Sequence, residues 1–283
     1  MPQLSKEILA KYRAQTYRLQ SPLTDREQAV AFVKERGFIH FWPIKGVELP
    51  SLWTAVAGDR PVADTHGDPA HITWDWKDSL LGERVWYYAK VLRKKATLIA
   101  LDVVPYFYAI SENYGSPDED YLIQYHEGKL TQEAKVVYEA LLDEGPLDTI
   151  SLRRATRMTS ADSKSRFERA LLTLQTDFKI LPIGISQAGG WRYAFIYDLV
   201  HRHYPELPRL AHPISQRQAR GKLLELYFYS VGAGQIRDLN LLFRWRPNDL
   251  ERAVQILVDQ GTICREIEVK GESGEWLALK TLI

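Results

Sequence analysis

The most regular part of the 283-residue sequence is the stretch 131–197, which has the sequence TQEAKVVYEALLDEGPLDTISLRRATRMTSADSKSRFERALLTLQTDFKILPIGISQAGGWRYAFIY. Apolar side chains recur at helical spacing over Thr131–Leu142, and Gly145-Pro146 ends this pattern. A short second helix is predicted at Ile150–Thr156. The stretch therefore begins with two helices that are separated by a turn.

A longer helix and a β-hairpin follow within the same stretch. Ser160 is the expected N-cap of this third helix. Its apolar face consists of Phe167, Leu171 and Leu174. Two strands are predicted at Ile180–Ile185 and Trp191–Tyr197, on either side of a turn at Ala188-Gly189-Gly190. The stretch thus predicts three helices followed by a hairpin.

The same order of elements recurs about 85 residues later in the chain. The first helix of this second copy has an apolar face formed by Leu223, Leu224, Tyr227 and Phe228. A short helix is predicted at Ile236–Leu242, and Pro247 is well placed to begin a third helix. Strands are predicted at Thr262–Val269 and Trp276–Leu282. Three helices followed by a hairpin is the order of a winged helix, which offers its third helix to the major groove of DNA.

The first 128 residues are less regular. The apolar pattern predicts helices at 6–19, 26–36 and 49–56, a polar loop at 58–72, and an aromatic helix at 84–92. The run 98–110 is rich in β-branched and aromatic residues, which predicts a hairpin arm bent at Pro105. We therefore expect an α+β protein of three tandem winged-helix domains, at 1–128, 129–212 and 213–283.

Composition narrows the class of protein. Hydrophobic residues make up 45% of the chain and charged residues 26%, so a substantial core is expected and disorder is not. No apolar run approaches the roughly 20 residues that span a bilayer. The single cysteine, Cys264, excludes an internal disulfide framework, and no histidine pair has convincing metal spacing. We expect a cytoplasmic protein that uses no metal and no cofactor and does not associate with membranes.

Positive charge is segregated along the chain although the net charge is only +1. The segment 153–169 holds six cations and two acids, a local balance of +4. A local basic face of this kind can bind the phosphates of duplex DNA. The last hairpin is acidic, which favours a bracing role or a protein partner for the last domain. The expected DNA contacts are Arg93, Lys94, Lys95, Arg153, Arg154, Arg157, Lys164, Arg166, Arg169 and Arg192.

Three strings of residues resemble the middle winged helix of the bacterial YcaQ/AlkZ family of crosslink-repair DNA glycosylases. These strings are Gly145-Pro146-Leu147, Lys164-Ser165-Arg166-Phe167-Glu168, and Tyr197-Asp198-Leu199-Val200-His201-Arg202-His203-Tyr204-Pro205. The resemblance covers nearly the whole chain as three tandem winged helices. It implies a concave basic cradle around duplex DNA and excision of alkylated purines without metal or cofactor.

The chain departs from that family at both catalytic motifs. The family's glutamine–hydrophobic–glutamine (or aspartate) triplet corresponds here to a segment with His40 and Trp42 in place of the polar pair. The family's hairpin carries a histidine and a Pro-Arg pair, of which only Pro105 matches, with Tyr106 at the arginine position. These departures argue against the family's excision chemistry in this chain.

Two other features are candidates for chemistry on an extruded base. The segment 74–78 offers the indoles of Trp74 and Trp76 for stacking, as does Trp42 nearby, and Asp75 between indoles is a candidate general base with a pKa raised by desolvation. His40 is a candidate to polarise a water or contact a base. The alternative for both is structural: tryptophans in the core, solvated aspartates, and a partly buried, hydrogen-bonded histidine.

Three functions remain open from the sequence. The leading interpretation is a duplex-DNA-binding protein that resembles the crosslink-repair glycosylases without their excision activity. The first alternative is an active DNA glycosylase that uses His40 or Asp75 in place of the missing amides. The second alternative is a winged-helix scaffold for protein–protein interaction.

Overall fold

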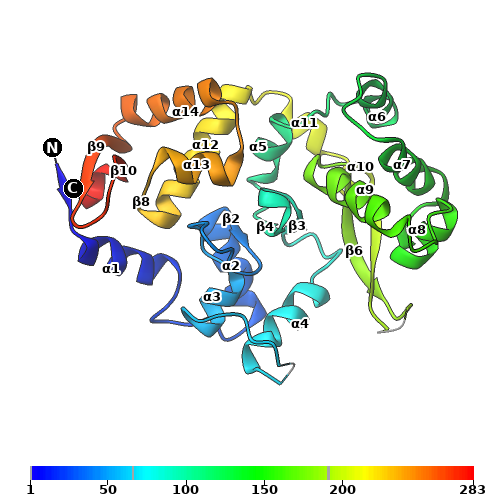
Figure 1. Ribbon diagram of the computed structural model, residues 1–283, viewed down its shortest axis with the longest axis horizontal. Helices are drawn as coiled ribbons and strands as arrows, with labels where there is room; N and C mark the ends of the chain where they lie inside the picture. The colour runs from blue at the N-terminus through cyan, green and yellow to red at the C-terminus, as the bar shows by residue number, and fades with distance from the viewer. Residues whose placement is uncertain (1, 66, 190–191) are drawn as a thin grey trace.

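The computed structural model describes residues 2–65, 67–189 and 192–283, and it has the α+β architecture that the sequence predicts. Helices dominate, and three small sheets lie along the chain. Each sheet belongs to a segment with one order of elements: helix, strand, two helices, then two strands. Figure 1 shows the three segments, with both chain termini at one end of the molecule.

The first of these segments, here called the first unit, spans residues 26–99. Its elements are α2 (Arg26–Arg36), β2 (Phe38–His40), α3 (Leu52–Ala57), α4 (Ile72–Ser79), β3 (Tyr87–Lys90) and β4 (Ala96–Ile99), with short 3-10 turns η1 (Pro69–His71) and η2 (Leu92–Lys94). The antiparallel sheet has the order β2-β4-β3, so the first strand pairs with the last. Helices α5 (Val104–Ala109) and α6 (Pro117–His126) lead to the next segment.

The middle unit spans residues 132–199. It consists of α7 (Gln132–Glu144), β5 (Leu147–Asp148), α8 (Thr149–Ala155), α9 (Lys164–Thr176), β6 (Ile180–Ser186) and β7 (Ala194–Leu199). Its sheet order, β5-β7-β6, repeats that of the first unit. The Thr131 hydroxyl caps α7 by accepting from the Ala134 N–H at 3.2 Å, and Gly145 ends the helix with a φ of 79°.

The last unit spans residues 216–279 and also includes the start of the chain. It consists of α12 (Gln216–Val231), β8 (Ala233–Gly234), α13 (Ile236–Phe243), α14 (Pro247–Asp259), β9 (Ile263–Val269) and β10 (Trp276–Leu279), followed by η3 (Lys280–Leu282). Helices α10 (Val200–His203) and α11 (Leu207–Ala211) connect it to the middle unit. Strand β1 (Gln3–Leu4) extends the sheet by pairing in parallel with β9.

Helix α1 (Lys6–Thr16) also packs on the last unit, although its place in the sequence predicted that it belongs with residues 1–128. The Arg13 guanidinium donates to the carbonyls of Val231 at 3.0 Å and Ala233 at 2.9 Å. The Tyr12 hydroxyl donates to the Tyr229 carbonyl at 2.8 Å. The two ends of the chain are therefore joined in one sheet and one packed layer.

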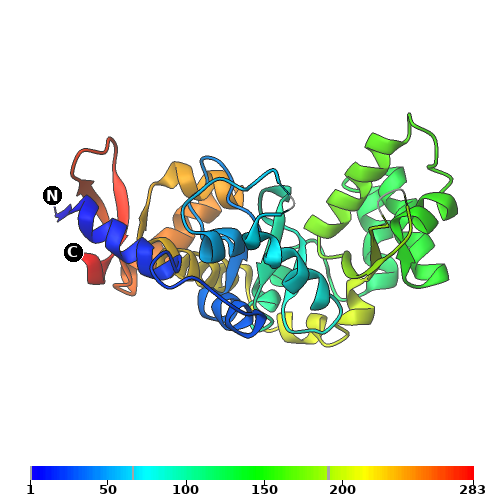
Figure 2. The same ribbon diagram turned by 90° about the horizontal axis from the view of Figure 1, so that it is seen from below.

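The first and last units share one hydrophobic core, whereas the middle unit has its own. Phe38 of β2 lies edge-on to Phe243 of α13 with ring centroids 6.2 Å apart, and both belong to or pack against the shared core. The core of the middle unit runs from Tyr121 to Leu199. Figure 2 shows the middle unit and the β9–β10 hairpin rising from the same side of the molecule at opposite ends.

Several local predictions were wrong. Residues 84–92 contain strand β3 rather than a helix, because the aromatic run is buried in the sheet. The predicted hairpin arm at 98–110 is instead the end of β4 followed by α5, with Pro105 in the first helical turn, where its missing N–H is not needed. Residues 74–78 form most of α4 rather than a loop.

Two smaller predictions differ from the structure or lie outside it. Ser163 is the N-cap residue of α9, and the Ser160 hydroxyl accepts from the Ser163 N–H at 3.2 Å instead of capping the helix itself. Gly190 and Trp191, predicted as the end of a turn and the start of a strand, lie outside the described residues; β7 begins at Ala194. None of the described helices combines the length and apolar character that a membrane span requires.

Candidate nucleic-acid interface

The cations of the middle unit lie on the helix pair α8–α9, and they fall into two groups. Arg153 is turned into its own loop, where its guanidinium donates to the carbonyls of Met158 and Ser160. Lys164 and Arg166 are exposed but lie within 4.0 Å of the carboxylates of Glu168 and Glu133. Three further arginines are exposed and form no ion pair in the part of the chain that the structure describes: Arg154, Arg157 and Arg169. Arg192 on the hairpin is also exposed.

Helix α9, the third helix of the middle unit, is free only over its N-terminal half. At its C-terminal end, the Thr176 hydroxyl donates to the Lys90 carbonyl at 3.0 Å, and the Gln175 side chain accepts from the Lys90 N–H at 3.2 Å. These contacts fix the helix against strand β3 of the first unit. The N-terminal residues of a third helix are the ones that contact base edges in helix-turn-helix proteins, so the free half is the half that recognition needs.

The third helix of the first unit, α4, faces the middle unit instead of solvent, through a buried lysine. The Lys77 side chain is 1% exposed and forms an ion pair with Asp78 of the same helix. Its ammonium donates to the Tyr193 hydroxyl at 3.0 Å, which in turn donates to Asp78 at 3.2 Å. Five aromatic rings lie within 5.8 Å of the ammonium: Phe41, Trp74, Tyr88, Tyr193 and Phe195.

This aromatic cage, defined by the five rings around Lys77, joins two units. Three rings come from the first unit, and two come from the hairpin of the middle unit. Desolvation lowers the pKa of Lys77, and the charge of Asp78 opposes that shift. The ammonium is held by ring faces and by one carboxylate, a combination that compensates for loss of water. The cage therefore fixes the hairpin of the middle unit against α4.

The tryptophans predicted to stack bases lie on different sides of α4. Trp42 is 37% exposed and lies edge-on to Trp74 with ring centroids 5.4 Å apart, so these two extend the aromatic cage to the surface. Trp76 is buried in the core of the first unit. Asp75 is exposed rather than packed between indoles, which removes the desolvation on which its role as a general base depended.

His40 is far more deeply buried than the sequence suggested. It lies in β2 at 1% exposure, and neither ring nitrogen has a hydrogen-bond partner in the described part of the chain. Burial lowers the pKa of His40 to about 4; the Ala96 carbonyl acts in the opposite direction, and the charge of Arg93 adds to the lowering. The imidazole is neutral near pH 7 and out of reach of bulk water. It is the prediction of a hydrogen-bonded, partly buried histidine that fails here.

We expect His40→Leu to stabilise the protein at pH 7 by about 1–3 kcal/mol, because a buried polar group without partners is replaced by an apolar side chain. The wild type should also lose up to about 3 kcal/mol as the pH falls from 6.5 to 4, since the unfolded state binds a proton that the folded state refuses. Urea denaturation of both proteins at pH 7 and pH 4.5 measures the difference. Identical pH dependence in the two proteins would contradict this account of His40.

A cavity of about 270 Å³ lies where the three units meet, at a place that no sequence pattern predicted. Its walls come from η2 in the first unit, the end of α9 in the middle unit, the end of α13 in the last unit, and α5. Arg93 and Lys94, predicted as DNA contacts, lie on this cavity, whereas Lys95 is exposed outside it. The described residues contain no cluster of three metal-ligating side chains.

The sequence matches the family described as AlkZ related over residues 23–232, well over half of the chain. The chain belongs to the AlkZ-related family. This confirms the family resemblance that the strings at 145–147, 164–168 and 197–205 predicted. The matched range includes the middle unit, the aromatic cage, His40 and Trp42, and it ends directly after α12.

Among solved structures, this AlkZ-related chain resembles the Streptomyces sahachiroi DNA glycosylase AlkZ. The two share 14% sequence identity and a TM-score of 0.58, over 99% of this chain and 71% of that chain. At this identity the likeness concerns the fold. No curated protein matches the sequence.

Proposed function

We propose that this chain binds duplex DNA through the middle unit, with its three units acting as tandem winged helices. The observation that carries the proposal is the free N-terminal half of α9, next to three exposed arginines without ion pairs in the described chain. Cations of this kind contact phosphates and position a protein on DNA without specifying sequence. The relationship to a DNA glycosylase fold supports the same partner.

The other two third helices support this division of labour. Helix α4 carries Lys77 and Trp74 into the aromatic cage, so its inner face is occupied within the molecule. Helix α14 packs on α12, and the neighbouring hairpin carries the exposed carboxylates of Glu266 and Glu268. Acidic side chains repel phosphate, so the last unit suits a bracing role, and it is also the surface we assign to a protein partner.

Excision of a base is the alternative, and it has weaker support. A water-activating group needs an acceptor near solvent, but His40 is buried and the indole of Trp42 offers a donor only. Asp75 has an accessible carboxylate, although no apolar surroundings enclose it. We therefore expect recognition of duplex DNA without release of a base by either residue.

Fluorescence anisotropy with a labelled duplex at low salt tests the proposal. We expect saturable binding, and no abasic sites in duplex carrying an N7-alkylguanine after incubation with the protein. Abasic sites that disappear in Asp75→Asn would favour the glycosylase alternative. Absence of saturable binding to any duplex would contradict the proposal and favour a protein-interaction scaffold.

A further inference from the structure

The cavity at the junction of the three units is lined by two aromatic pairs. Phe243 and Trp245 stack with ring centroids 4.3 Å apart and an interplanar angle of 20°. Phe107 and Phe178 are nearly parallel, with centroids 6.1 Å apart. A dry cavity of roughly 150 Å³ suffices for benzene, so about 270 Å³ suits a flat ring system of two fused rings. The walls therefore favour a planar aromatic ligand.

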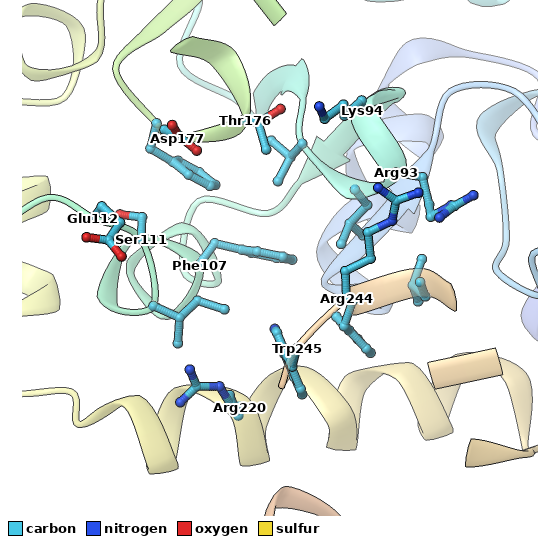
Figure 3. A pocket seen from close by; sticks show the side chains of 16 residues that line it. Arg93, Lys94, Phe107, Ser111, Glu112, Thr176, Asp177, Arg220, Arg244 and Trp245 are labelled. Atoms are coloured by element: carbon cyan, nitrogen blue, oxygen red, sulfur yellow. The ribbon is translucent and has the colours of Figure 1, made fainter. Parts of the chain in front are cut away.

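The polar groups of the cavity are sorted by charge. Figure 3 shows Arg93, Lys94 and Arg244 along one side, Glu112 and Asp177 on the other, and aromatic side chains between them. The three cations form no ion pair in the described part of the chain, whereas Glu112 is paired with Lys129 at 2.8 Å. Lys94 and Arg244 are exposed, so the uncompensated positive charge lies at the mouth.

Two features show that this wall is kept at a cost. Arg93, Lys94, Phe178 and Arg244 all have φ between 54° and 58°, a region that side chains other than glycine rarely occupy. Such residues cluster at ligand clamps, where surrounding structure holds them in place. The Nε atoms of Arg93 and Arg220, both lining residues, are buried and have no partner among the described residues. A bound anion would supply partners for guanidinium groups of this kind.

The acidic side of the cavity matches the edge of a base. Burial raises the pKa of Asp177 to about 6, with the charge of Lys179 acting against the shift. At slightly acidic pH this carboxyl therefore both donates and accepts hydrogen bonds. The edges of nucleobases present donors and acceptors side by side. An acid opposite a cationic wall, with aromatic rings between, fits a ligand with a base at one end and a phosphate at the other.

We propose that this cavity binds a nucleotide, with the base among Phe107, Phe243 and Trp245 and the phosphate at Arg93, Lys94 and Arg244. The same chemistry is offered by a free mononucleotide and by a nucleotide extruded from a duplex. Only the second source rests on the proposed DNA binding. Stacking of a base on an aromatic side chain is sequence-tolerant, so the ring system sets the ligand class more than the identity of the base.

One arm of the test uses deoxyguanosine monophosphate and the free protein, measured by titration calorimetry. We expect saturable binding that weakens at least about fivefold in Trp245→Ala, the loss expected when base stacking is removed. Arg244→Gln, at an exposed position that the core does not need, should weaken it similarly. Arg252→Gln removes an exposed arginine of α14 that does not line the cavity, and it should have no effect.

The second arm compares duplexes with and without one mismatched guanine. Mismatched bases cost less to extrude, so extrusion predicts tighter binding of the mismatched duplex and loss of that preference in Trp245→Ala and Arg244→Gln. The proposal is overturned if the wild type neither binds the mononucleotide nor prefers the mismatch, or if both variants behave as wild type in both arms. Duplex binding that persists in that case leaves the proposed function standing, and the mononucleotide arm remains valid if duplex binding fails.

Discussion

Replacing Lys77 with alanine is expected to destabilise the protein by about 2–5 kcal/mol, a large effect for a single substitution. The side chain is 1% exposed and fills the centre of a cage of five aromatic rings. Removing it leaves a cavity among these rings and removes the ion-pair partner of Asp78. Because two of the rings come from the middle unit, the packing between units should loosen as well.

Urea denaturation gives the loss of stability, and hydrogen exchange of β6 and β7 shows where it occurs. Lys77→Met is the matched control, since it keeps the volume and removes the charge. We expect it to cost less than about 1.5 kcal/mol, because Asp78 is 18% exposed and keeps the Tyr193 hydroxyl. An alanine variant as stable as the wild type, with unchanged exchange in the hairpin, would mean that the cage does not hold the two units together.

The second large effect concerns affinity for DNA. The combined variant Arg154→Gln, Arg157→Gln and Arg169→Gln is expected to weaken duplex binding roughly tenfold or more at moderate salt, because each phosphate contact releases counterions. The loss should be similar for unrelated sequences, since phosphate contacts do not specify bases. Stability should change little, because all three side chains are exposed.

A charge-matched control separates the α8–α9 face from a general effect of net charge. The variant Lys34→Gln, Lys45→Gln and Lys270→Gln removes three exposed cations that lie outside the middle unit and form no ion pair among the described residues. Its affinity should stay within about twofold of wild type if phosphates are bound at α8–α9. Equal losses in both triple variants would show that binding follows bulk charge.

The fold was predictable where periodicity was long and its stop signals were clear. Helices α7, α9, α12 and α14 have apolar faces repeated over three turns or more, and Gly145 and Pro247 mark boundaries. Prediction failed at β3, where an aromatic run buried on both faces has no alternation to distinguish strand from helix. Strands β5 and β8 have two residues each, too short to leave a pattern.

The candidate sites were less predictable because they are assembled from distant segments. Lys77 stood in the sequence between aromatic residues, which was the one local signal of the cage, but Tyr193 and Phe195 reach it from more than 110 residues away. The junction cavity joins η2, α5 and the ends of α9 and α13, and no spacing rule links these. Asp75 and His40 were chosen from neighbours along the chain, whereas their exposure is set by helix phase and strand pairing.

The salt dependence of duplex binding tests the central claim most directly. The slope of log affinity against log salt should be negative and become shallower by about 2.7 in the variant without Arg154, Arg157 and Arg169, or roughly 0.9 for each phosphate that the variant no longer neutralises. The control variant, which removes three cations elsewhere, should keep the wild-type slope. A flat wild-type slope, or one that these three arginines do not alter, would contradict phosphate binding by the middle unit.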